Sequence, residues 1–269
     1  MTATTGKLRA FLDAAPAAAL VEVTEAKGST PREQGAWMLV TQDAIFGTIG
    51  GGQLEFLAIG KARELIRENV ATGALDIPLG PEIGQCCGGR VNIGISLVDE
   101  TKRRELTQRA ATEDESRPHV LVFGGGHVGH ALSAALVLLP LHVTLVETRA
   151  EALPGVAAGT RTVLTPVPEE AVRGAPAGSA YVVLTHDHSL DFLIVAEALK
   201  RKDAAYVGMI GSKTKRATFR SWYLREAGGA EADLARLVTP IGGSAVKDKR
   251  PAVIAALAAA EIFTALSQR

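Results

Sequence analysis

Short apolar runs, separated by glycine, proline and polar residues, make up the first part of the chain. Apolar runs of about 4–8 residues bounded by turn residues are typical of β-strands. Strands are predicted at 20–25, 36–40, 44–48, 75–79 and 91–98. Between them, apolar residues at positions 54, 57, 58, 65 and 66 recur at helical spacing, which predicts a helix over 54–69. This mixture predicts an α+β domain.

The second part alternates buried-strand patterns with helical patterns. Strands are predicted at 119–123, 142–146, 180–184 and 205–207, with a short one near Leu237. Helices are predicted to begin at His127 and to cover 189–200, 213–227 and 251–266. Because such alternation requires crossover connections, we expect a largely parallel sheet with helices on both faces. The second part is therefore predicted to be a Rossmann-like, doubly wound α/β domain.

The polar stretch 112–118 separates the two parts. It lacks apolar periodicity and ends in Pro118, which restricts the backbone of the residue before it. We therefore predict an α+β domain at 1–111, a linker at 112–118 and a Rossmann-like domain at 119–269.

Charge is balanced in this chain of 269 residues, with 29 Lys and Arg against 29 Asp and Glu. No global field attracts nucleic acid or an acidic membrane surface, so neither is expected as a partner. The alanine-rich opening 8–23 is interrupted by Arg9, Asp13 and Pro16, and the apolar run 252–260 is far shorter than the roughly 20 residues that cross a bilayer. We expect neither a signal peptide nor a membrane span.

The only two cysteines, Cys86 and Cys87, are adjacent and stand in the segment Gly84 to Arg90. An adjacent pair cannot build a disulfide framework, so we expect a reducing, cytoplasmic compartment. A thiolate is a strong nucleophile and a soft metal ligand, and Arg90 nearby would favour that charged form. The segment predicts either a sulfur-bearing site, for a soft metal or a transferable sulfur atom, or a buried structural pair beside a turn.

Gly124, Gly126 and Gly129 form a G-x-G-x-x-G pattern directly after a predicted strand and at the start of a predicted helix. In that context the first glycine permits a tight turn, the second lets the backbone approach a phosphate, and the third lets helix and strand pack closely. Glu147, at the end of the next strand, is either an acceptor for ribose hydroxyls or a solvated residue. We expect phosphate binding at the turn, while the group that carries the phosphate stays open.

A loop with two histidines follows a later strand of the second domain. His186, Asp187 and His188 are expected at the carboxyl edge of the sheet, where ligands bind in open α/β folds. They line a ligand there, bind a metal or cap the following helix. Asp187 is the natural group to orient either imidazole.

Glycine-rich loops occur at three further places. The segments 28–32 and 47–55 hold too many glycines for strand interiors, so we expect loops, the second presenting backbone amides to an anion before a helix. After another strand, Ser212 is expected to cap a helix, while Lys213 and Lys215 add positive charge at its start. Anion binding and an ordinary capped helix both fit this last loop.

Taken together, six segments resemble the XdhC family, the xanthine dehydrogenase accessory proteins related to CoxI. These segments are 28–32, 47–55, 84–90, 124–129, 185–188 and 208–213. The resemblance implies a non-enzymatic maturation factor that binds molybdenum cofactor, protects it, supports its sulfuration and delivers it to apo xanthine dehydrogenase. It also implies a cysteine desulfurase as the sulfur donor. One departure is a basic segment at 247–251, where the family has a shorter and less charged link.

The resemblance maps the family's cysteine segment onto Cys86 and Cys87 and its Rossmann turn onto 124–129. On this interpretation the two cysteines hold the sulfur and metal end of molybdopterin, and the glycine turns of the second domain hold its phosphate. The residues predicted to bind the cofactor are Gln85, Cys86, Cys87, Arg90, Gly124, Gly126, His127, Gly129, Glu147, His186, Asp187, His188, Ser212 and Lys213. We further expect the loop 84–90 to face the carboxyl edge of the second domain's sheet, in the same chain or across a dimer.

Two other functions use part of these features. An NAD(P)-dependent oxidoreductase would use 124–129 with Glu147, and a dithiol redox sensor would use Cys86 and Cys87. The first leaves the cysteine segment without a role and the second leaves the Rossmann domain without one, whereas a cofactor carrier uses both. A nucleotide as a further ligand stays open. The alanine-rich helix 251–266 packs either against a second copy, in a homodimer, or against the core of its own domain.

Overall fold

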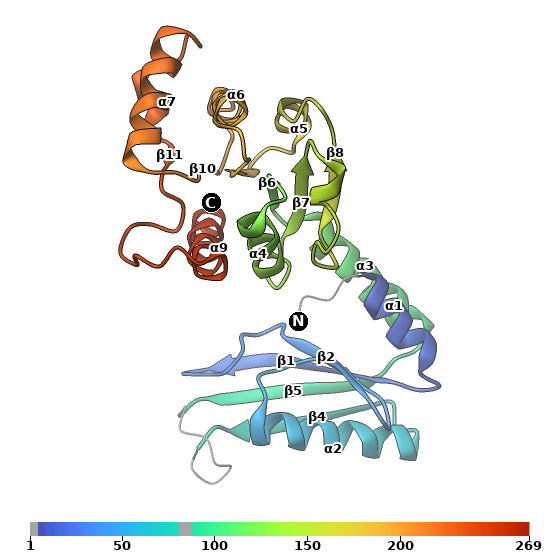
Figure 1. Ribbon diagram of the computed structural model, residues 1–269. Helices are drawn as coiled ribbons and strands as arrows, with labels where there is room; N and C mark the ends of the chain where they lie inside the picture. The colour runs from blue at the N-terminus through green and yellow to red at the C-terminus, as the bar shows by residue number, and fades with distance from the viewer. Residues whose placement is uncertain (1–4, 81–87, 269) are drawn as a thin grey trace. The chain divides into compact units, whose positions relative to one another are not determined.

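The computed structural model describes residues 5–80 and 88–268 of the chain (Figure 1). The predicted cofactor ligands Gln85, Cys86 and Cys87 lie outside the described residues. The chain divides into two compact units, Met1–Ser116 and Arg117–Arg269.

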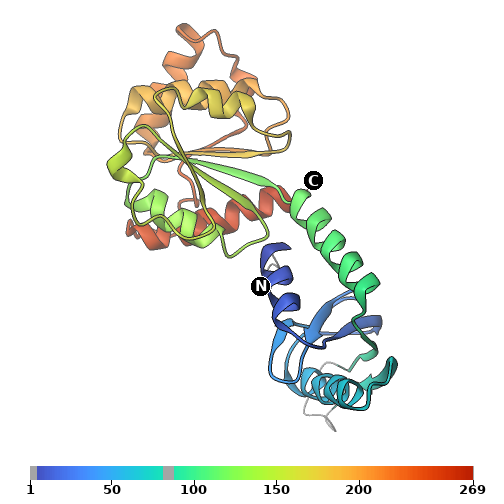
Figure 2. The ribbon, with the colours of Figure 1, turned by 90° about the vertical axis from the view of Figure 1, so that its right-hand side faces the viewer.

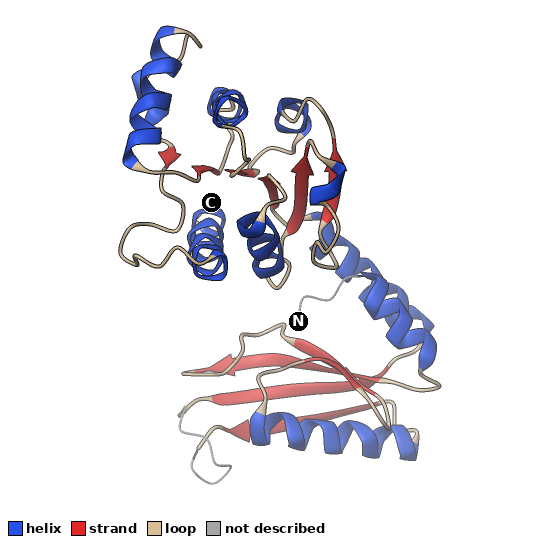
Figure 3. Ribbon diagram, in the orientation of Figure 1, coloured by secondary structure: helices blue, strands red, loops and turns tan. Residues whose placement is uncertain are grey.

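The first unit contains a five-stranded antiparallel sheet in the order β3-β2-β1-β5-β4. The strands are β1 (Ala19–Lys27), β2 (Trp37–Val40), β3 (Ile45–Gly47), β4 (Thr72–Pro78) and β5 (Arg90–Leu97). All five were predicted, with shifted ends. The long strands β1 and β5 pair over most of their length and form the centre of the sheet (Figure 3).

Helices pack on both faces of this sheet, although α1 and α3 cover only part of theirs. Residues along β1 alternate between the two faces. Val21 and Val23 belong to the core beneath α2 (Gly52–Glu68), the helix predicted at 54–69. Leu20 faces the other way and packs in a second cluster with residues of α1 (Thr5–Ala14) and α3 (Glu100–Glu115). The first unit is thus an α+β domain with two cores.

Helix α3 occupies part of the stretch expected to be a linker. The helix begins after Asp99, whose carboxylate accepts a hydrogen bond from the Lys102 amide at 2.8 Å, and continues to Glu115. Only Leu106 and Ala110 of α3 are buried. A helix that buries so few side chains lacks a clear apolar stripe, so residues 112–115 gave no helical signal in the sequence.

The second unit is built on a six-stranded parallel sheet in the order β11-β10-β9-β6-β7-β8. The strands are β6 (His119–Phe123), β7 (His142–Glu147), β8 (Arg161–Leu164), β9 (Ala180–Val183), β10 (Tyr206–Met209) and β11 (Leu237–Val238). The predicted doubly wound parallel architecture is confirmed. Strand β8 and the short helix α5 (Glu169–Gly174) that follows it were not predicted.

Helices lie on both faces of the parallel sheet (Figure 2). Leu121 and Phe123 of β6 pack on the face covered by α5, α6 (His188–Lys200), α7 (Lys213–Arg225) and α8 (Glu231–Leu234). Val120 and Val122 pack on the face covered by α4 (His127–Leu136) and α9 (Pro251–Ser267). Strands buried on both faces read as continuous apolar runs, which is why β6 and β9 were recognised in the sequence.

Helix α9 uses its small residues within its own unit. Ala255, Ala258 and Ile262 are buried in the cluster that also contains Leu132 and Leu136 of α4. Of the two packing modes expected for this helix, the intramolecular one is observed. Among residues 5–80 and 88–268, no helix is both long and apolar enough to cross a membrane.

Candidate functional site

The predicted ligand residues of the second unit meet at the carboxyl edge of its sheet. Strand β6 lies between β7 and β9. From β6 the chain continues outward to β7 and β8 and then returns to β9 on the other side of β6, so the strand order changes direction between β6 and β9. The two loops are in contact, since a Cβ added at Gly124 would lie 2.6 Å from the Leu184 carbonyl oxygen and 3.0 Å from the Thr185 Cα. Open α/β sheets bind ligands at this position.

The glycine turn has the geometry that the sequence pattern predicts. Gly124 has φ 114°, which side chains disfavour, and a Cβ at Gly129 would come within 1.9 Å of the Gly124 carbonyl oxygen. Gly126 is the N-cap of α4, where no side chain caps the helix. No atom lies within 4 Å of a Cβ added at Gly126, and the neighbouring His127 is exposed. The first amides of α4 are therefore open to an anion.

Glu147 is bound by the backbone of the glycine turn and of its own loop. Its carboxylate is 3% exposed and accepts hydrogen bonds from the amides of Gly125 at 2.7 Å, Thr148 at 2.8 Å and Arg149 at 3.0 Å. The Arg149 guanidinium also donates to it, at 3.3 Å. Burial alone would raise the pKa of Glu147, but the hydrogen bonds from Arg149, Gly125 and Thr148 outweigh it and lower the pKa to about 2. The carboxylate thus holds the turn together instead of facing a ribose.

The histidine loop after β9 also uses its acid internally. The Asp187 carboxylate accepts a hydrogen bond from the Ser189 amide at 2.7 Å and so caps α6. It is therefore engaged by the helix instead of orienting an imidazole. His186 and His188 are exposed beside it. The described part of the chain contains no group of three or more His, Cys, Asp or Glu that could hold a metal ion.

The two lysines at the start of α7 point to different surroundings. Ser212 caps the helix by accepting a hydrogen bond from the Lys215 amide at 3.3 Å, as predicted. Lys213 is exposed at the helix start, where its charge is available to an anion. Lys215 instead turns inward and its ammonium pairs with the buried Asp191 of α6. Lys215 therefore adds no free charge at this helix start.

Sequence reasoning missed Asp191 and Arg149. The signal for Asp191 is an acid within an apolar run, Leu190 to Val195, of a predicted helix. Such a residue must have a partner if the helix is buried, because an unpaired buried carboxylate is costly. Arg149 carried the weaker signal of a cation two residues after the acid at the end of β7.

In the first unit, three glycine-rich segments of the sequence come together. Ser29 forms an isolated parallel β-bridge with Gly88, and a Cβ at Gly89 would lie 2.3 Å from the Ser29 carbonyl oxygen. A Cβ at Gly50 would lie 2.8 Å from the Pro31 Cβ. The segments 28–32, 47–55 and 88–90 thus form one cluster, which we call the glycine-loop cluster.

The glycine-loop cluster adjoins the cysteine segment along the chain. Gly88 follows Cys87 directly in the sequence. The Leu79 amide donates to the Gly89 carbonyl oxygen at 2.8 Å, and the Gly88 amide donates to the Leu79 carbonyl oxygen at 2.9 Å. The two ends of the segment that contains Cys86 are therefore fixed to each other and to Ser29.

Helix α2 begins within the glycine-loop cluster. Gly50, Gly51 and Gly52 have φ values of 129°, 81° and 67°, and no side chain caps the helix at Gly51. Glu55 in the first turn accepts hydrogen bonds from the Thr48 hydroxyl at 2.7 Å and the Ile49 amide at 3.0 Å, which fixes the loop before the helix. Arg32, beside Gly50, is exposed.

Arg90 is paired with an acid of the neighbouring strand. Its Nε and Nη2 donate to the two carboxylate oxygens of Asp76, each at 2.6 Å. These hydrogen bonds lower the pKa of Asp76 below its ordinary value. The charge expected to favour a thiolate in the cysteine segment is thus balanced by Asp76, which weakens that expectation.

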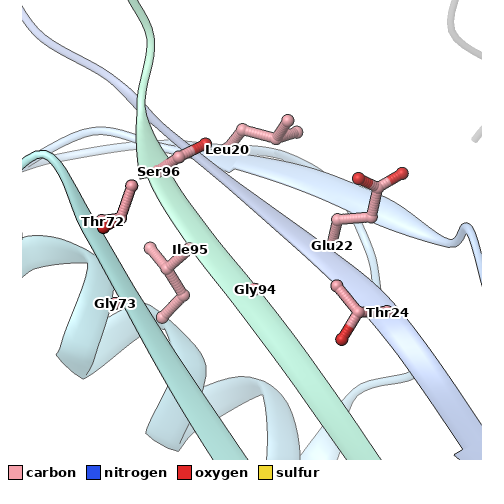
Figure 4. A pocket seen from close by; sticks show the side chains of 8 residues that line it. All are labelled: Leu20, Glu22, Thr24, Thr72, Gly73, Gly94, Ile95 and Ser96. Carbon is pink, nitrogen blue, oxygen red and sulfur yellow. The ribbon is translucent and has the colours of Figure 1, made fainter.

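A shallow hollow of about 260 Å³ lies over β1, β5 and β4, on the same face of the first sheet as Leu20 (Figure 4). Its floor includes Gly94, and the Glu22 carboxylate at its side is paired with Arg109 at 2.8 Å. The lining residues are Leu20, Glu22, Thr24, Thr72, Gly73, Gly94, Ile95 and Ser96. None of the predicted cofactor ligands lines this hollow.

The fold and its loops define a class of protein in which an α+β unit with clustered glycine loops precedes a Rossmann unit with an open glycine turn. Residues 120–262 match the XdhC Rossmann domain, and residues 11–76 match the XdhC and CoxI family. The chain belongs to the XdhC family.

The chain is also similar to two individual proteins. It is 26% identical over 257 residues to YqeB, an uncharacterized protein of Escherichia coli strain K12, with 91% of this chain and 43% of YqeB covered. The chain thus spans less than half the length of this curated relative. It also resembles the crystal structure of a xanthine dehydrogenase from Bacillus halodurans, with a TM-score of 0.81, 16% identity, and 98% of this chain and 96% of that chain covered. At this identity the likeness shows the fold.

Proposed function

We propose that the chain is a non-enzymatic maturation factor that binds molybdenum cofactor, protects it, supports its sulfuration and delivers it to apo xanthine dehydrogenase. Membership of the XdhC family supports an accessory role for xanthine dehydrogenase. The observation that carries the proposal is the glycine-loop cluster, in which Ser29 pairs with Gly88 next to Cys87. Residues far apart in sequence are thereby gathered at Gly88, the residue that follows Cys87 along the chain.

Each of the two units offers groups whose chemistry suits molybdopterin. Molybdenum bound by a pterin dithiolene prefers sulfur ligands, which Cys86 and Cys87 provide. The phosphate of the pterin needs amide donors, which the open start of α4 at Gly126 provides. Lys213 is an exposed cation at a neighbouring loop of the same edge. A cysteine desulfurase is the proposed source of the sulfur that Cys86 or Cys87 passes on as a persulfide.

The alternative, an NAD(P)-dependent oxidoreductase, is disfavoured by Glu147. A dinucleotide site needs an exposed acid at the end of the second strand to accept hydrogen bonds from the ribose hydroxyls. The Glu147 carboxylate is 3% exposed and already accepts hydrogen bonds from three backbone amides. Binding of an adenosine ribose at this position would break bonds that hold the glycine turn.

The proposal is tested by coexpressing the chain with molybdenum cofactor biosynthesis and purifying it without oxygen. We expect pterin fluorescence in extracts of the wild-type protein and its loss in the double variant Cys86→Ser/Cys87→Ser. Activation of apo xanthine dehydrogenase should fall in parallel. Thr101→Ser, an equally small change on the exposed surface of α3, serves as the control and should behave as wild type.

Two results would contradict the proposal. One is wild-type protein that contains no molybdopterin after coexpression. The other is unchanged maturation of xanthine dehydrogenase when both cysteines are serine. A homodimer, which the sequence left open, is checked separately by light scattering on the purified chain.

A further inference from the structure

A buried ion pair lies beside the carboxyl edge of the second unit's sheet, which we call the ligand edge. The Asp191 carboxylate of α6 is 0% exposed, and the Lys215 ammonium of α7, 9% exposed, donates to it. Removing two charges from water costs several kcal/mol per ion, and an apolar pair of similar size holds two helices at least as well. Stability is thus a poor explanation for this pair.

The ion pair also reaches the loop after β9. The second oxygen of Asp191 accepts hydrogen bonds from both the amide of Thr185, at 2.9 Å, and its hydroxyl, at 2.7 Å. The Thr185 hydroxyl oxygen in turn accepts from the Asp187 amide at 3.2 Å, and Asp187 caps α6. A continuous set of hydrogen bonds therefore runs from Lys215 to the start of α6.

The geometry of the neighbouring loop serves the same pair. A Cβ added at Gly211 would lie 2.6 Å from Cδ of Lys215, so only a glycine there leaves room for the lysine stem to turn inward. Gly211 has φ 159°, close to extended backbone, so its lack of a side chain matters here for space. Gly211 thus has a structural reason to be glycine that is separate from anion binding.

Thr185 is placed where its position affects the glycine turn. A Cβ at Gly124 would lie 3.0 Å from the Thr185 Cα, so the two backbones are packed against each other. Any displacement of Thr185 therefore changes the space next to the turn. Close-packed interiors transmit such shifts because they hold few voids.

We propose that Lys215, Asp191 and Thr185 are positioning residues that hold the loop Thr185–His188 rigidly against the glycine turn, so that the ligand edge is formed before its anionic ligand arrives. The inference rests on the proposed function only in taking a phosphate-bearing ligand to bind at this edge. A preformed site loses less conformational entropy on binding. The charges of Asp191 and Lys215 neutralise each other inside the unit. The ligand therefore contacts backbone amides and exposed side chains.

The test compares two substitutions of Thr185 that differ in the hydroxyl. Thr185→Ser keeps the hydrogen bond to Asp191, whereas Thr185→Val keeps the shape and removes the hydroxyl. In the full chain we expect Thr185→Val to speed hydrogen exchange of the backbone amides at 185–190 at least ~10-fold and to weaken binding of inorganic phosphate, measured by calorimetry, by about tenfold. Thr185→Ser should keep both properties near wild type.

A second pair of variants separates position from stability. In the double variant Asp191→Leu/Lys215→Met, apolar residues replace the ion pair. We expect its midpoint of thermal unfolding to be near that of the wild type. Hydrogen exchange at 185–190 should nevertheless be faster, and phosphate binding weaker, than in the wild type. Lys202→Met is the matched control, since it removes an exposed ammonium, 76% exposed, from its pair with Asp233. It should change neither exchange nor phosphate binding.

Three outcomes overturn the inference. These are wild-type exchange and phosphate affinity in Thr185→Val, recovery of both in the double variant, and wild-type protein that binds no phosphate at millimolar concentration. Pterin content is measured on the same samples. Fast exchange and weak phosphate binding in Thr185→Val, in a wild-type protein that carries no pterin, would support the inference while contradicting the proposed function.

Discussion

The carboxylate of Glu147 joins three backbone amides, at Gly125, Thr148 and Arg149. It therefore ties the end of β7 to the glycine turn after β6. A single charged side chain fixes two loops of the ligand edge in this way. Hydrogen bonds to an ionised acceptor are about twice as strong as neutral ones, so this residue matters more than its size indicates.

Acid titration tests this role of Glu147. Because its pKa falls from 4.5 to about 2 on folding, it stabilises the protein above pH 4.5 and loses that contribution as the pH falls towards 2. We expect Glu147→Gln to lower the free energy of unfolding by about 2 kcal/mol at pH 7. The difference from wild type should shrink between pH 4.5 and pH 2, as measured by denaturant titration.

An exposed acid provides the control for this titration. Glu170→Gln, on the surface of α5, should change stability little at any pH. A difference between wild type and Glu147→Gln that stayed constant from pH 7 to pH 2 would show that the charge of Glu147 does not stabilise the fold.

Single residues were the hardest features to predict from the sequence. The pattern after β7 placed Glu147 at the right end of the strand, but the direction of its carboxylate depends on the turn that follows, which no periodicity encodes. The sequence pattern predicts Lys213 and Lys215 alike as charges at one helix start. Two residues correspond to about 200° around a helix, so the lysines point to nearly opposite sides. That argument was available from the sequence alone.

At the scale of an element, the start of α4 depends on two glycines in different ways. A Cβ at Gly129 would collide with the Gly124 carbonyl oxygen at 1.9 Å, whereas a Cβ at Gly126 meets no atom within 4 Å. Gly129 is therefore required for the fold, whereas Gly126 leaves the first amides of α4 accessible. The same helix thus offers a structural variant and a functional one.

Two alanine substitutions separate these roles. We expect Gly129→Ala to lower the midpoint of thermal unfolding strongly, because helix and turn must move apart. Gly126→Ala should unfold within a degree or two of wild type but bind inorganic phosphate about tenfold more weakly, because its methyl group occupies the side where an anion approaches the amides. Equal phosphate affinity in Gly126→Ala and wild type, measured by calorimetry, would place the anion elsewhere.

The glycine-loop cluster gives a parallel prediction in the first unit. Gly89→Ala places a methyl group 2.3 Å from the Ser29 carbonyl oxygen, so we expect it to separate the segments 28–32 and 88–90 and to reduce pterin content after coexpression. Gly60→Ala, in the middle of α2 with no atom near the new methyl, is the control and should stabilise the protein by roughly 0.5–1 kcal/mol. Pterin content equal in both variants would separate the cluster from cofactor binding.

Elements were predicted best where burial on both faces left a continuous apolar run. Strand β9, with every residue buried, is predicted by its apolar run. Strand β8 is not, because Arg161 and Thr162 are exposed at the edge of the sheet and its sequence carries little apolar signal. The sequence likewise predicts a linker for the end of helix α3, since residues 112–115 face solvent or lie at its polar end.

At the scale of the whole molecule, each unit has its own core. Leu54 of α2 is fully buried in a cluster made of residues 19–95, and Leu132 of α4 is fully buried in a cluster made of residues 120–266. Chains with separate cores commonly unfold in more than one step. The architecture itself, an α+β unit before a parallel α/β unit, followed from the order of periodicities. The candidate site was predicted only in part, because the contacts among 28–32, 50 and 88–89 join residues distant in sequence.

Calorimetry of core variants tests the separation. We expect two transitions, with Leu54→Ala lowering one and Leu132→Ala lowering the other, each by about 2–5 kcal/mol in unfolding free energy. The two substitutions remove the same side chain from equally buried helix positions, so each serves as the control for the other. A single transition that both variants lower would show that the units unfold as one.

The pair of Asp191 and Lys215 also bears on how this sequence changes over generations. Losing either residue alone leaves a charge buried without a partner, which costs about 3–5 kcal/mol, comparable to the whole stability of many domains. A lineage can therefore leave the paired state only through an intermediate that folds poorly. Descendants of this chain are expected to keep both residues or to exchange both, so that position 191 in an alignment foretells position 215.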